Sequence, residues 1–364
     1  MPTSESFAPN LLDLAPLDAE RALQRATAEC GEPPYRAAQV VRWLWERPAR
    51  SFDDMTNLPL RFRESLAQRF VVPRLELAHE QRSADGTRKF LFRLHDGQTV
   101  ETVAIPEGER TTICISSQAG CALRCAFCAT GAMGFARNLD AWEIAGQVRE
   151  MHLLAEPVAP TNVVFMGMGE PLLNWEAVSR ALTILNHPRG LGIGARHITV
   201  STVGVLPGIV ALQERPEQFR LALSIHAPTD ALRRTLMPIN VKYPLADVIE
   251  AAARFDRRVT FEYVMLGEVN DAPEHAAELA RLARQCGAFV NLIPLHPGGT
   301  GTFAPSPPAR MTAFVRALRA QGVDVAVRRS RGVDIAAACG QLRTERLRRR
   351  RPVGADENGE IHVA

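Results

Sequence analysis

The sequence has no long hydrophobic run and almost no lysine. No apolar stretch approaches the roughly 18 residues needed to span a bilayer, and residues 1–6 lack the basic start and apolar stretch of a signal peptide. We therefore expect a cytoplasmic protein that makes no membrane contact. Lys89 and Lys242 are the only lysines, so 41 of the 43 basic residues are arginines. We attribute this imbalance to the codon composition of the source genome.

The remaining composition is that of an ordinary folded protein. The chain has 364 residues, 46% hydrophobic and 23% charged, which excludes a disordered, collagen-like or mucin-like protein. At about 150 residues per domain, this length allows two or three domains or one large barrel with additions. The net charge of +3 does not by itself indicate a polyanionic partner. Seven cysteines, an odd number, favour metal binding or thiol chemistry over a disulfide framework.

Residues 1–95 are predicted to form a helical module followed by the start of a β-hairpin. Apolar residues recur at helical spacing over residues 35–45 and again over residues 58–70. Residues 89–94 alternate between polar and apolar side chains, Asp96-Gly97 is a strong hairpin turn, and residues 99–105 alternate again. The main domain is therefore predicted to span residues 96–342.

From residue 111 to residue 341, short apolar runs alternate with helical patterns. Six βα units of this kind predict parallel strands with right-handed crossovers, hence an α/β fold with a full or partial barrel. Catalytic residues of such a barrel lie at the C-terminal ends of the strands. After it, residues 343–364 form an Arg-rich C-terminal tail. The expected strands are 112–117, 162–166, 197–202, 219–225, 259–264 and 289–293, and the expected helices include 140–154, 175–185, 246–255, 272–285 and 309–321.

Three cysteines follow the first expected strand directly. Cys121, Cys125 and Cys128 form a C-x3-C-x2-C loop. Close thiolates bind soft metals, and a cubane iron–sulfur cluster normally takes four cysteines. Three cysteines therefore leave one iron with an open position that can bind a substrate. The alternative is a structural zinc knuckle that recruits a distant His or Cys as its fourth ligand.

Further polar residues are expected at the ends of the following strands. Gly169 and Glu170 end the second strand, where glycine lets a backbone approach closely and a carboxylate can bind an ammonium group. Ser201 ends the third strand, and Ser224-Ile225-His226 ends the fourth. Each of these residues is commonplace by itself, because serine and histidine at strand ends often only cap or pack. Together they are predicted to line the mouth of the barrel.

The cysteine loop resembles the cluster motif of the radical SAM superfamily. With the other motifs, the chain resembles the RlmN/Cfr family of radical SAM rRNA adenine methyltransferases, and residues 52–57 are similar to that family's N-terminal module. The resemblance implies a partial (β/α)6 radical SAM barrel with an N-terminal helical accessory domain that contacts RNA. The motifs are the cysteine loop, Gly-Met-Gly-Glu-Pro at 167–171, Ser-Ile-His-Ala-Pro at 224–228, Met-Pro-Ile-Asn at 237–240, and Arg-Gly-Val-Asp at 331–334 followed by Cys339-Gly-Gln-Leu.

The resemblance also implies a chemistry for this chain. The three loop cysteines would hold a [4Fe–4S] cluster, and S-adenosylmethionine (SAM) would bind at its open iron and at the strand ends. One SAM would methylate Cys339, and a second would supply a 5′-deoxyadenosyl radical. The S-methylcysteine would then carry its carbon to C2 of adenine in 23S rRNA, with tRNA as a second substrate. Glu101 would be the proton acceptor, and Cys114 would release the product through a transient disulfide with Cys339.

One residue departs from the family pattern. His296 precedes Pro297 where the family usually has an asparagine that is associated with SAM binding. The histidine ring can still form a hydrogen bond, in a manner that depends on its tautomer. We therefore place His296 among the cofactor-binding candidates.

The expected partners follow from the same resemblance. Arginines of residues 36–50 and of the C-terminal tail can neutralise RNA phosphates, although arginine on an exposed helix is commonly only solvated. A flavodoxin-type electron donor and a monomeric enzyme are expected. Three alternatives stay open: the same chemistry at adenine C8, as in the Cfr branch; a radical SAM enzyme acting on a protein or small molecule; and a zinc-stabilised RNA-binding protein.

Overall fold

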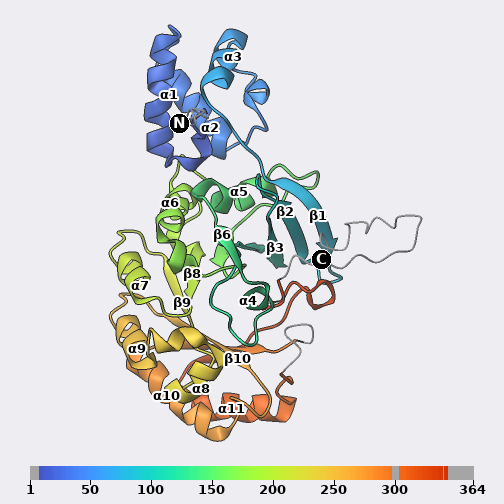
Figure 1. Ribbon diagram of the computed structural model, residues 1–364, viewed down its shortest axis with the longest axis vertical. Helices are drawn as coiled ribbons and strands as arrows, with labels where there is room; N and C mark the ends of the chain where they lie inside the picture. The colour runs from blue at the N-terminus through green and yellow to red at the C-terminus, as the bar shows by residue number, and fades with distance from the viewer. Residues whose placement is uncertain (1–7, 297–302, 339, 343–364) are drawn as a thin grey trace, which may run out of the picture.

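The computed structural model describes residues 8–296, 303–338 and 340–342. The molecule is elongated, with a helical module at one end and an α/β body making up the rest (Figure 1). Helix α2 forms where Val40, Val41 and Leu44 place a buried apolar stripe at helical spacing. The module contains α1 (Pro16–Glu29), α2 (Tyr35–Trp45) and α3 (Leu60–Arg69), with 3-10 turns at Leu11–Asp13 and Phe52–Asp54.

Ten strands of the described residues form one sheet, in the order β1-β2-β3-β4-β7-β8-β9-β10-β11-β12. The first four strands are antiparallel, and from β4 onward each strand is parallel to its neighbour. Since β1 and β12 stand at opposite ends of this order, the sheet is a partial barrel. Its strands are β1 (Glu76–Arg82), β2 (Arg88–Arg93), β3 (Thr99–Glu107), β4 (Arg110–Cys114), β7 (Asn162–Phe165), β8 (Ile198–Thr202), β9 (Arg220–Ser224), β10 (Thr260–Met265), β11 (Phe289–Pro294) and β12 (Val325–Val327).

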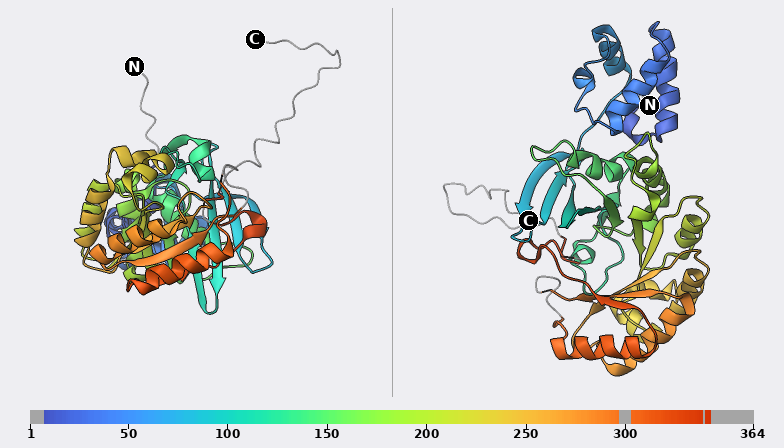
Figure 2. Two further views of the ribbon diagram at one scale, coloured as in Figure 1. Left: turned by 90° about the horizontal axis from the view of Figure 1, so that it is seen from below. Right: turned by 180° about the vertical axis from the view of Figure 1, so that it is seen from behind.

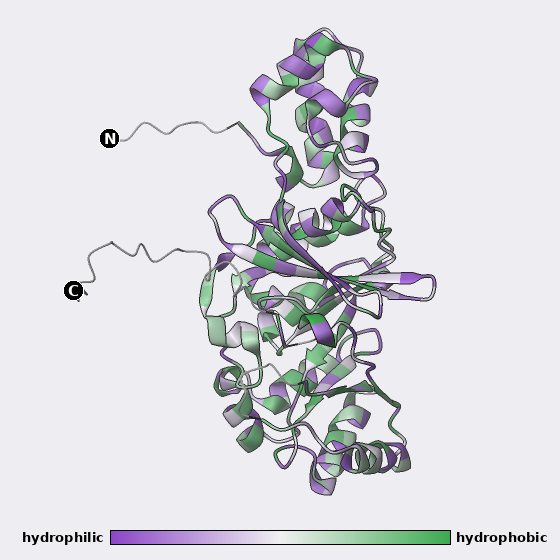
Figure 3. Cartoon of the chain, turned by 90° about the vertical axis from the view of Figure 1, so that its right-hand side faces the viewer, coloured by the Kyte–Doolittle hydropathy of each residue, from purple (hydrophilic) through white to green (hydrophobic). Residues whose placement is uncertain are grey.

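Helices connect the parallel strands. Helices α6, α7, α9, α10 and α11 follow one another along the outer side of the sheet (Figures 1 and 2), and they carry adjacent hydrophobic and hydrophilic bands (Figure 3). The short helix α8 lies at the C-terminal ends of β8 and β9, where its Arg233 donates to Val203 O and Ser224 O. No helix within the described ranges is long and apolar enough to cross a membrane. The helices are α4 (Ala129–Met133), α5 (Ala141–Met151), α6 (Trp175–Asn186), α7 (Leu206–Gln213), α8 (Asp230–Leu236), α9 (Leu245–Ala253), α10 (Pro273–Cys286) and α11 (Pro308–Ala320), with 3-10 turns at Pro171–Asn174, Ala195–His197, Pro238–Val241 and Val333–Ile335.

The predicted α/β fold with a partial barrel is confirmed. The six predicted strands correspond to β4 and β7–β11, and β12 adds a further parallel strand at one edge. The first strand ends earlier than predicted, at Cys114, because the chain then leaves the ladder. Ser116 N donates to the Gln147 side chain at 2.8 Å, and Ser117 N donates to Met168 O at 2.8 Å. A small second sheet follows, in which β5 (Gln118–Gly120) pairs with β6 (Phe135–Asn138).

The predicted hairpin is present as the antiparallel pair β2–β3. Its turn includes Gly97 at φ +81°, a left-handed conformation that favours glycine. β1 pairs with the other side of β2. The predicted boundary between the helical module and the main domain, at residue 96, therefore falls inside one continuous sheet.

A buried arginine joins the helical module to α5. Arg149 is 1% exposed, and its Nε donates to Leu44 O at 2.8 Å while another guanidinium nitrogen donates to Ala49 O. Burial lowers the pKa of Arg149 to about 10, and the carboxylate of Glu150 opposes that change. The module is therefore fixed to the body by charge-assisted bonds to its backbone.

Candidate active site

The cysteine loop lies between the two strands of the small sheet. β5 runs directly into Cys121, whose N donates to Gly134 O at 2.8 Å, and α4 begins directly after Cys128. Gly120 is required here, because a Cβ at this position would lie 2.0 Å from Gly134 O. Arg124, inside the loop, has φ +53°, a conformation that costs energy for a non-glycine residue and is common at functional sites. The loop is thus held in one shape from both ends.

The three loop cysteines line one cavity of about 160 Å³. Five of the cofactor-binding residues predicted from the sequence line the same cavity, at the ends of three successive parallel strands. The topology therefore brings together residues that are distant in the sequence, as expected at the C-terminal ends of barrel strands. These five residues are Gly169, Glu170, Ser201, Ser224 and His226.

The thiols of this cavity match an iron–sulfur cluster in chemistry and arrangement. Burial raises the pKa of Cys121 to about 11, and burial with the neighbouring thiolates raises the pKa of Cys125 as well. Thiolates at these positions therefore need a bound cation, because metal ligation deprotonates the thiols. No three His, Cys, Asp or Glu side chains among the described residues are close enough to hold a single metal ion. All three thiols line one cavity, as the ligands of a single iron–sulfur cluster must.

Glu170 is held rigidly at the end of β7. It is 2% exposed, and its carboxylate accepts hydrogen bonds from Leu172 N at 3.0 Å and Val203 N at 2.9 Å. Burial raises its pKa to about 7, and these hydrogen bonds oppose the rise. Gly169 has φ +99°, and a Cβ there would lie 2.5 Å from the Cβ of Gln118. Glycine is therefore the residue that this turn accepts.

His226 is a neutral hydrogen-bond donor toward the cavity. Its Nδ1 accepts from Val264 N at 3.0 Å, which leaves the proton on Nε2. Burial, assisted by the charge of Arg233, lowers its pKa to about 3. Ile225 is different, because its side chain is fully buried and does not line the cavity. Its backbone N donates to Glu262 O at 3.0 Å, so it fixes the strand end.

A second cavity of about 410 Å³ adjoins the first. Cys114 and His296 line it, so the structure places His296 with Cys114 and not with the cluster cysteines. His296 Nε2 shares a hydrogen bond with Ser330 Oγ, and burial lowers its pKa. Three arginines and one acidic residue, Glu107, give this cavity a net positive lining. Residues lining both cavities are Met166, Ile293, Arg328 and Leu342, and the arginines are Arg328, Arg329 and Arg331.

Cys339 lies outside the described residues. Its neighbour Ala338 lines the Cys114 cavity, and its other neighbour Gly340 lines the cluster cavity. The segment is anchored beyond this point, because Ala129 N donates to Gly340 O and Thr130 Oγ1 donates to Leu342 O, each at 2.8 Å. The described chain therefore lines the Cys114 cavity up to Ala338 and the cluster cavity again from Gly340.

Glu101 lies on the same face of the sheet as Cys114. Val103 pairs with Cys114 across β3–β4, and side chains two residues apart on a strand share a face. Glu101 is 4% exposed, and the Nζ of Lys89 lies 3.3 Å from its Oε1. The two catalytic candidates of the described residues, Glu101 and Cys114, are thus brought together.

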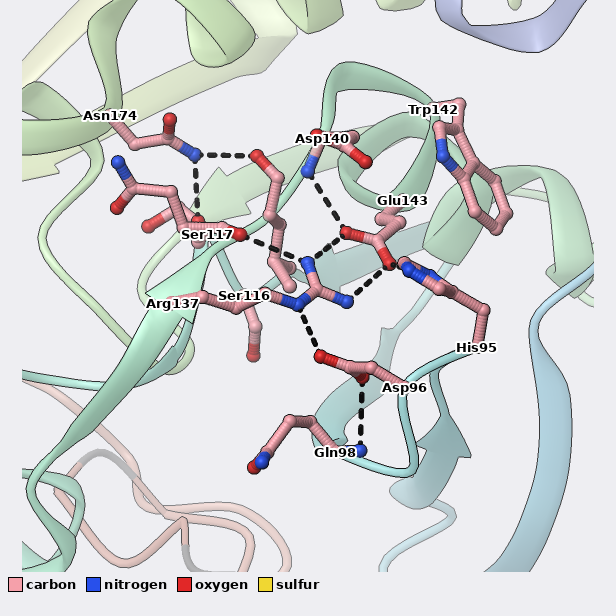
Figure 4. A network of polar contacts seen from close by, with 12 residues as sticks. His95, Asp96, Gln98, Ser116, Ser117, Arg137, Asp140, Trp142, Glu143 and Asn174 are labelled. Carbon is pink, nitrogen blue, oxygen red and sulfur yellow. Dashed lines mark hydrogen bonds and ion pairs between the residues drawn. The ribbon is translucent and has the colours of Figure 1, made fainter. Parts of the chain in front are cut away.

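A polar network supports the small sheet and α5 (Figure 4). Arg137 on β6 donates to both carboxylate oxygens of Glu143, at 2.7 and 2.8 Å, and to Asp96 Oδ2 at 2.6 Å. Glu143 also accepts from Asp140 N at 2.9 Å, which completes a capping box at the start of α5. The hairpin turn, β6 and α5 are therefore joined by one buried carboxylate close to the cluster loop.

Three charged residues of the site were not predicted from the sequence. Glu262 and Arg328 line the cluster cavity, and burial raises the pKa of Glu262 against the opposing effect of Arg328. Arg233 is fully buried and donates to the carbonyls of Val203 and Ser224 at two strand ends. Of these three, only Glu262 could have been found from the sequence, because it is the one charged residue inside the predicted strand 259–264.

Comparisons with known proteins agree with this geometry. The family model for the radical SAM superfamily matches residues 115–280, and the model for the ribosomal RNA large subunit methyltransferase N-terminal domain matches residues 9–72. A probable dual-specificity RNA methyltransferase RlmN of Gemmatimonas aurantiaca is 70% identical over 98% of this chain and 99% of its own length. The dual-specificity RNA methyltransferase RlmN of Anaeromyxobacter dehalogenans is 50% identical over 92% of each chain.

A solved structure gives the same result. The crystal structure of a radical SAM methyltransferase from Sphaerobacter thermophilus matches with a TM-score of 0.85 and 45% identity, over 92% of this chain and 99% of the other. Radical SAM enzymes use a [4Fe–4S] cluster and SAM, which the donor set of the first cavity fits. The chain belongs to the RlmN family of radical SAM dual-specificity RNA methyltransferases.

Proposed function

We propose that this enzyme methylates C2 of adenine in 23S rRNA and in tRNA, using two molecules of SAM per product and an S-methylcysteine intermediate on Cys339. One observation carries the proposal. A cavity that contains the cluster cysteines adjoins a cavity that contains Cys114, and the residues on either side of Cys339 line one cavity each. With chain neighbours in both cavities, Cys339 would receive a methyl group from SAM in one and deliver it to the base in the other.

The residues of the first cavity would hold the cluster and SAM. Cys121, Cys125 and Cys128 are the cluster ligands, and the cluster supplies the electron for reductive cleavage of SAM. Gly169 and Glu170 would bind the amino group of SAM, which suits a fixed carboxylate acceptor. The other polar groups on this wall are Ser201, Ser224 and His226, with Ile225 positioning the last two. His296 would contact SAM from the adjoining cavity.

Cys114 in the second cavity, and Glu101 on the same face of the sheet, would act on the RNA base. Glu101 would accept the proton from adenine C2, and Cys114 would form a transient disulfide with Cys339 that releases the methylated base. Arg328, Arg329 and Arg331 give the cavity the positive charge that a nucleotide requires. The target adenine must leave its stack to enter, as other base-modifying enzymes require.

The N-terminal module and the C-terminal tail would contact the rest of the RNA. The arginines of residues 36–50 lie in the module, and those of the tail, residues 343–364, fall outside the described residues. The proposed electron donor is flavodoxin-like, and the proposed enzyme is a cytoplasmic monomer. Size-exclusion chromatography with light scattering measures the oligomeric state directly.

The decisive test is an anaerobic reaction of reconstituted enzyme with SAM, a reductant and a 23S rRNA fragment or tRNA. Released nucleosides are identified by chromatography and mass spectrometry. We expect 2-methyladenosine from both RNAs, and none from the Cys339→Ala variant. Formation of 8-methyladenosine would instead establish the C8 reaction, and absence of any methylated adenosine despite an intact cluster would refute the proposal. Iron and zinc analysis on the same sample tests the zinc alternative.

A further inference from the structure

One of the two lysines is buried beside the proposed proton acceptor. Lys89 lies on β2 and is 7% exposed. Its Nζ is 3.3 Å from Glu101 Oε1 and donates to Ala336 O at 3.1 Å. A lysine is seldom buried unless its charge is paired, so this position requires an explanation.

The register of the sheet explains how Lys89 reaches Glu101. Lys89 pairs with Val103, and Leu91 pairs with Glu101, so Lys89 and Glu101 are diagonal neighbours on one face of β2–β3. Cys114 pairs with Val103 from the other side and lies on that same face. The ammonium, the carboxylate and the thiol therefore share one surface of the sheet.

The segment that leads to Cys339 covers this surface. Gly332 N donates to Asp85 Oδ2 at 3.0 Å, and Ser83 Oγ donates to Asp334 Oδ1 at 2.6 Å, which attaches the segment to the β1–β2 turn. Ala336 follows in the left-handed conformation, at φ +50°, and its carbonyl accepts the bond from Lys89. Lys89 thus contacts both the proposed proton acceptor and the chain close to the proposed methyl carrier.

From this geometry we propose that Lys89 is a positioning residue, which keeps the Glu101 carboxylate ionised and fixed beside the segment that precedes Cys339. The inference rests on the proposed role of Glu101. An ammonium at this distance favours the charged carboxylate, and only that form can take a proton from adenine C2. Glu101 then becomes a carboxylic acid, while Lys89 takes part in neither the proton transfer nor any electron transfer.

Other titratable and charged groups face the same region and belong in any interpretation of pH dependence. By register, the face that carries Glu101 also carries Glu76 and His79 on β1, Arg93 on β2, Glu107 on β3, and Arg110 and Cys114 on β4. The segment over this face contributes Arg328, Arg329, Arg331 and Asp334.

The test compares Lys89→Gln with Lys89→Arg and with Lys242→Gln. Glutamine keeps an amide donor but carries no charge, whereas arginine keeps the charge. Lys242 is the only other lysine; it is exposed, lies over the ring of Tyr243 and serves as the control. The measurement is the yield of methylated adenosine against pH, with S-methyl-Cys339 quantified by mass spectrometry in the same samples.

We expect Lys89→Gln to move the acidic limb of the pH profile to higher pH by about 1–3 units. Yield on that limb then falls about ten-fold or more, while S-methyl-Cys339 forms as in the wild type. RNA deuterated at adenine C2 should show a larger isotope effect in this variant, because proton removal becomes slower. Lys89→Arg should keep the wild-type limb, and so should Lys242→Gln.

The outcomes separate this inference from the role of Glu101. An unmoved acidic limb in Lys89→Gln with normal S-methyl-Cys339 overturns the inference about Lys89. Full methylation by Glu101→Gln overturns the role of Glu101 as proton acceptor and the inference with it. If Glu101→Gln blocks methylation while Lys89→Gln keeps the wild-type pH profile, the role of Glu101 stands and only the inference about Lys89 fails. If Lys89→Gln does not fold, Lys89→Met takes its place once urea titration shows that it is folded. An unmoved acidic limb in that variant, with normal S-methyl-Cys339, overturns the inference.

Discussion

Replacing Arg137 by Met should destabilise the protein by removing the partner of a buried carboxylate. Glu143 is fully buried, and Arg137 binds it through two parallel bonds of 2.7 and 2.8 Å. Loss of one partner from a buried ion pair costs about 3–5 kcal/mol, because the remaining charge keeps its desolvation penalty. The Arg137 side chain is 25% exposed, so water can reach the gap, and we expect about 3 kcal/mol.

The assay is urea unfolding of the wild type, Arg137→Met, Glu143→Gln and the double variant, followed by circular dichroism. Since both partners are gone in the double variant, its loss of unfolding free energy should be smaller than the sum of the two single losses. β6 pairs with β5, which leads into Cys121, so iron bound per chain should also fall in Arg137→Met.

The matched control is Arg254→Met. Arg254 pairs with Glu250 on the surface, where the two side chains are 71% and 63% exposed, and such pairs contribute at most about 0.5 kcal/mol. A cost for Arg137→Met that is no larger than the cost of this control would refute the reasoning. An additive double variant would refute the claim that the two side chains act as a pair.

Three further predictions concern the site and its attachment. Burial raises the pKa of Glu170 to about 7, so its carboxylate form is lost below that pH. SAM affinity, measured by anaerobic calorimetry, should then fall by up to about ten-fold per pH unit. The fall should be less steep in Glu170→Gln, which has no carboxylate to protonate. Gly169→Ala should abolish SAM binding because its Cβ would lie 2.8 Å from Gln118 N. The control is Gly192→Ala, at φ +67° with open space around the added Cβ. It should keep SAM binding and lose only about 1–2 kcal/mol of unfolding free energy, measured by thermal unfolding. Arg149→Met should lower RNA methylation and raise hydrogen exchange in the N-terminal module, while SAM cleavage without RNA persists; equal loss of both activities would contradict this.

The sequence by itself determined the parts of the protein that depend on local pattern. The hairpin around Gly97 follows from alternation and a turn of two residues. The cluster loop follows from the spacing of its cysteines. The position of Gly169, Ser201 and Ser224 around one cavity follows from topology, because parallel strands with right-handed crossovers bring their C-terminal ends to one edge.

Short or uniform elements carried no such pattern. β12 has three residues, and α7 (Leu206–Gln213) is apolar almost throughout, so neither has a measurable period. The division of the site into two cavities was also invisible in the sequence. His296 follows β11 at a strand end like the other candidates, yet it lies with Cys114 because Ser330, from beyond β12, binds its ring.

Only the tertiary structure decided which distant groups meet. Lys89 and Glu101 are twelve positions apart, and their contact depends on the register of two strands; Lys89 and Ala336 are separated by 247 positions. A period along the chain shows which face of an element is buried, but it does not identify the segment that covers that face. The charge pairs around the site form where packing brings distant parts of the chain together and excludes water from the surfaces between them.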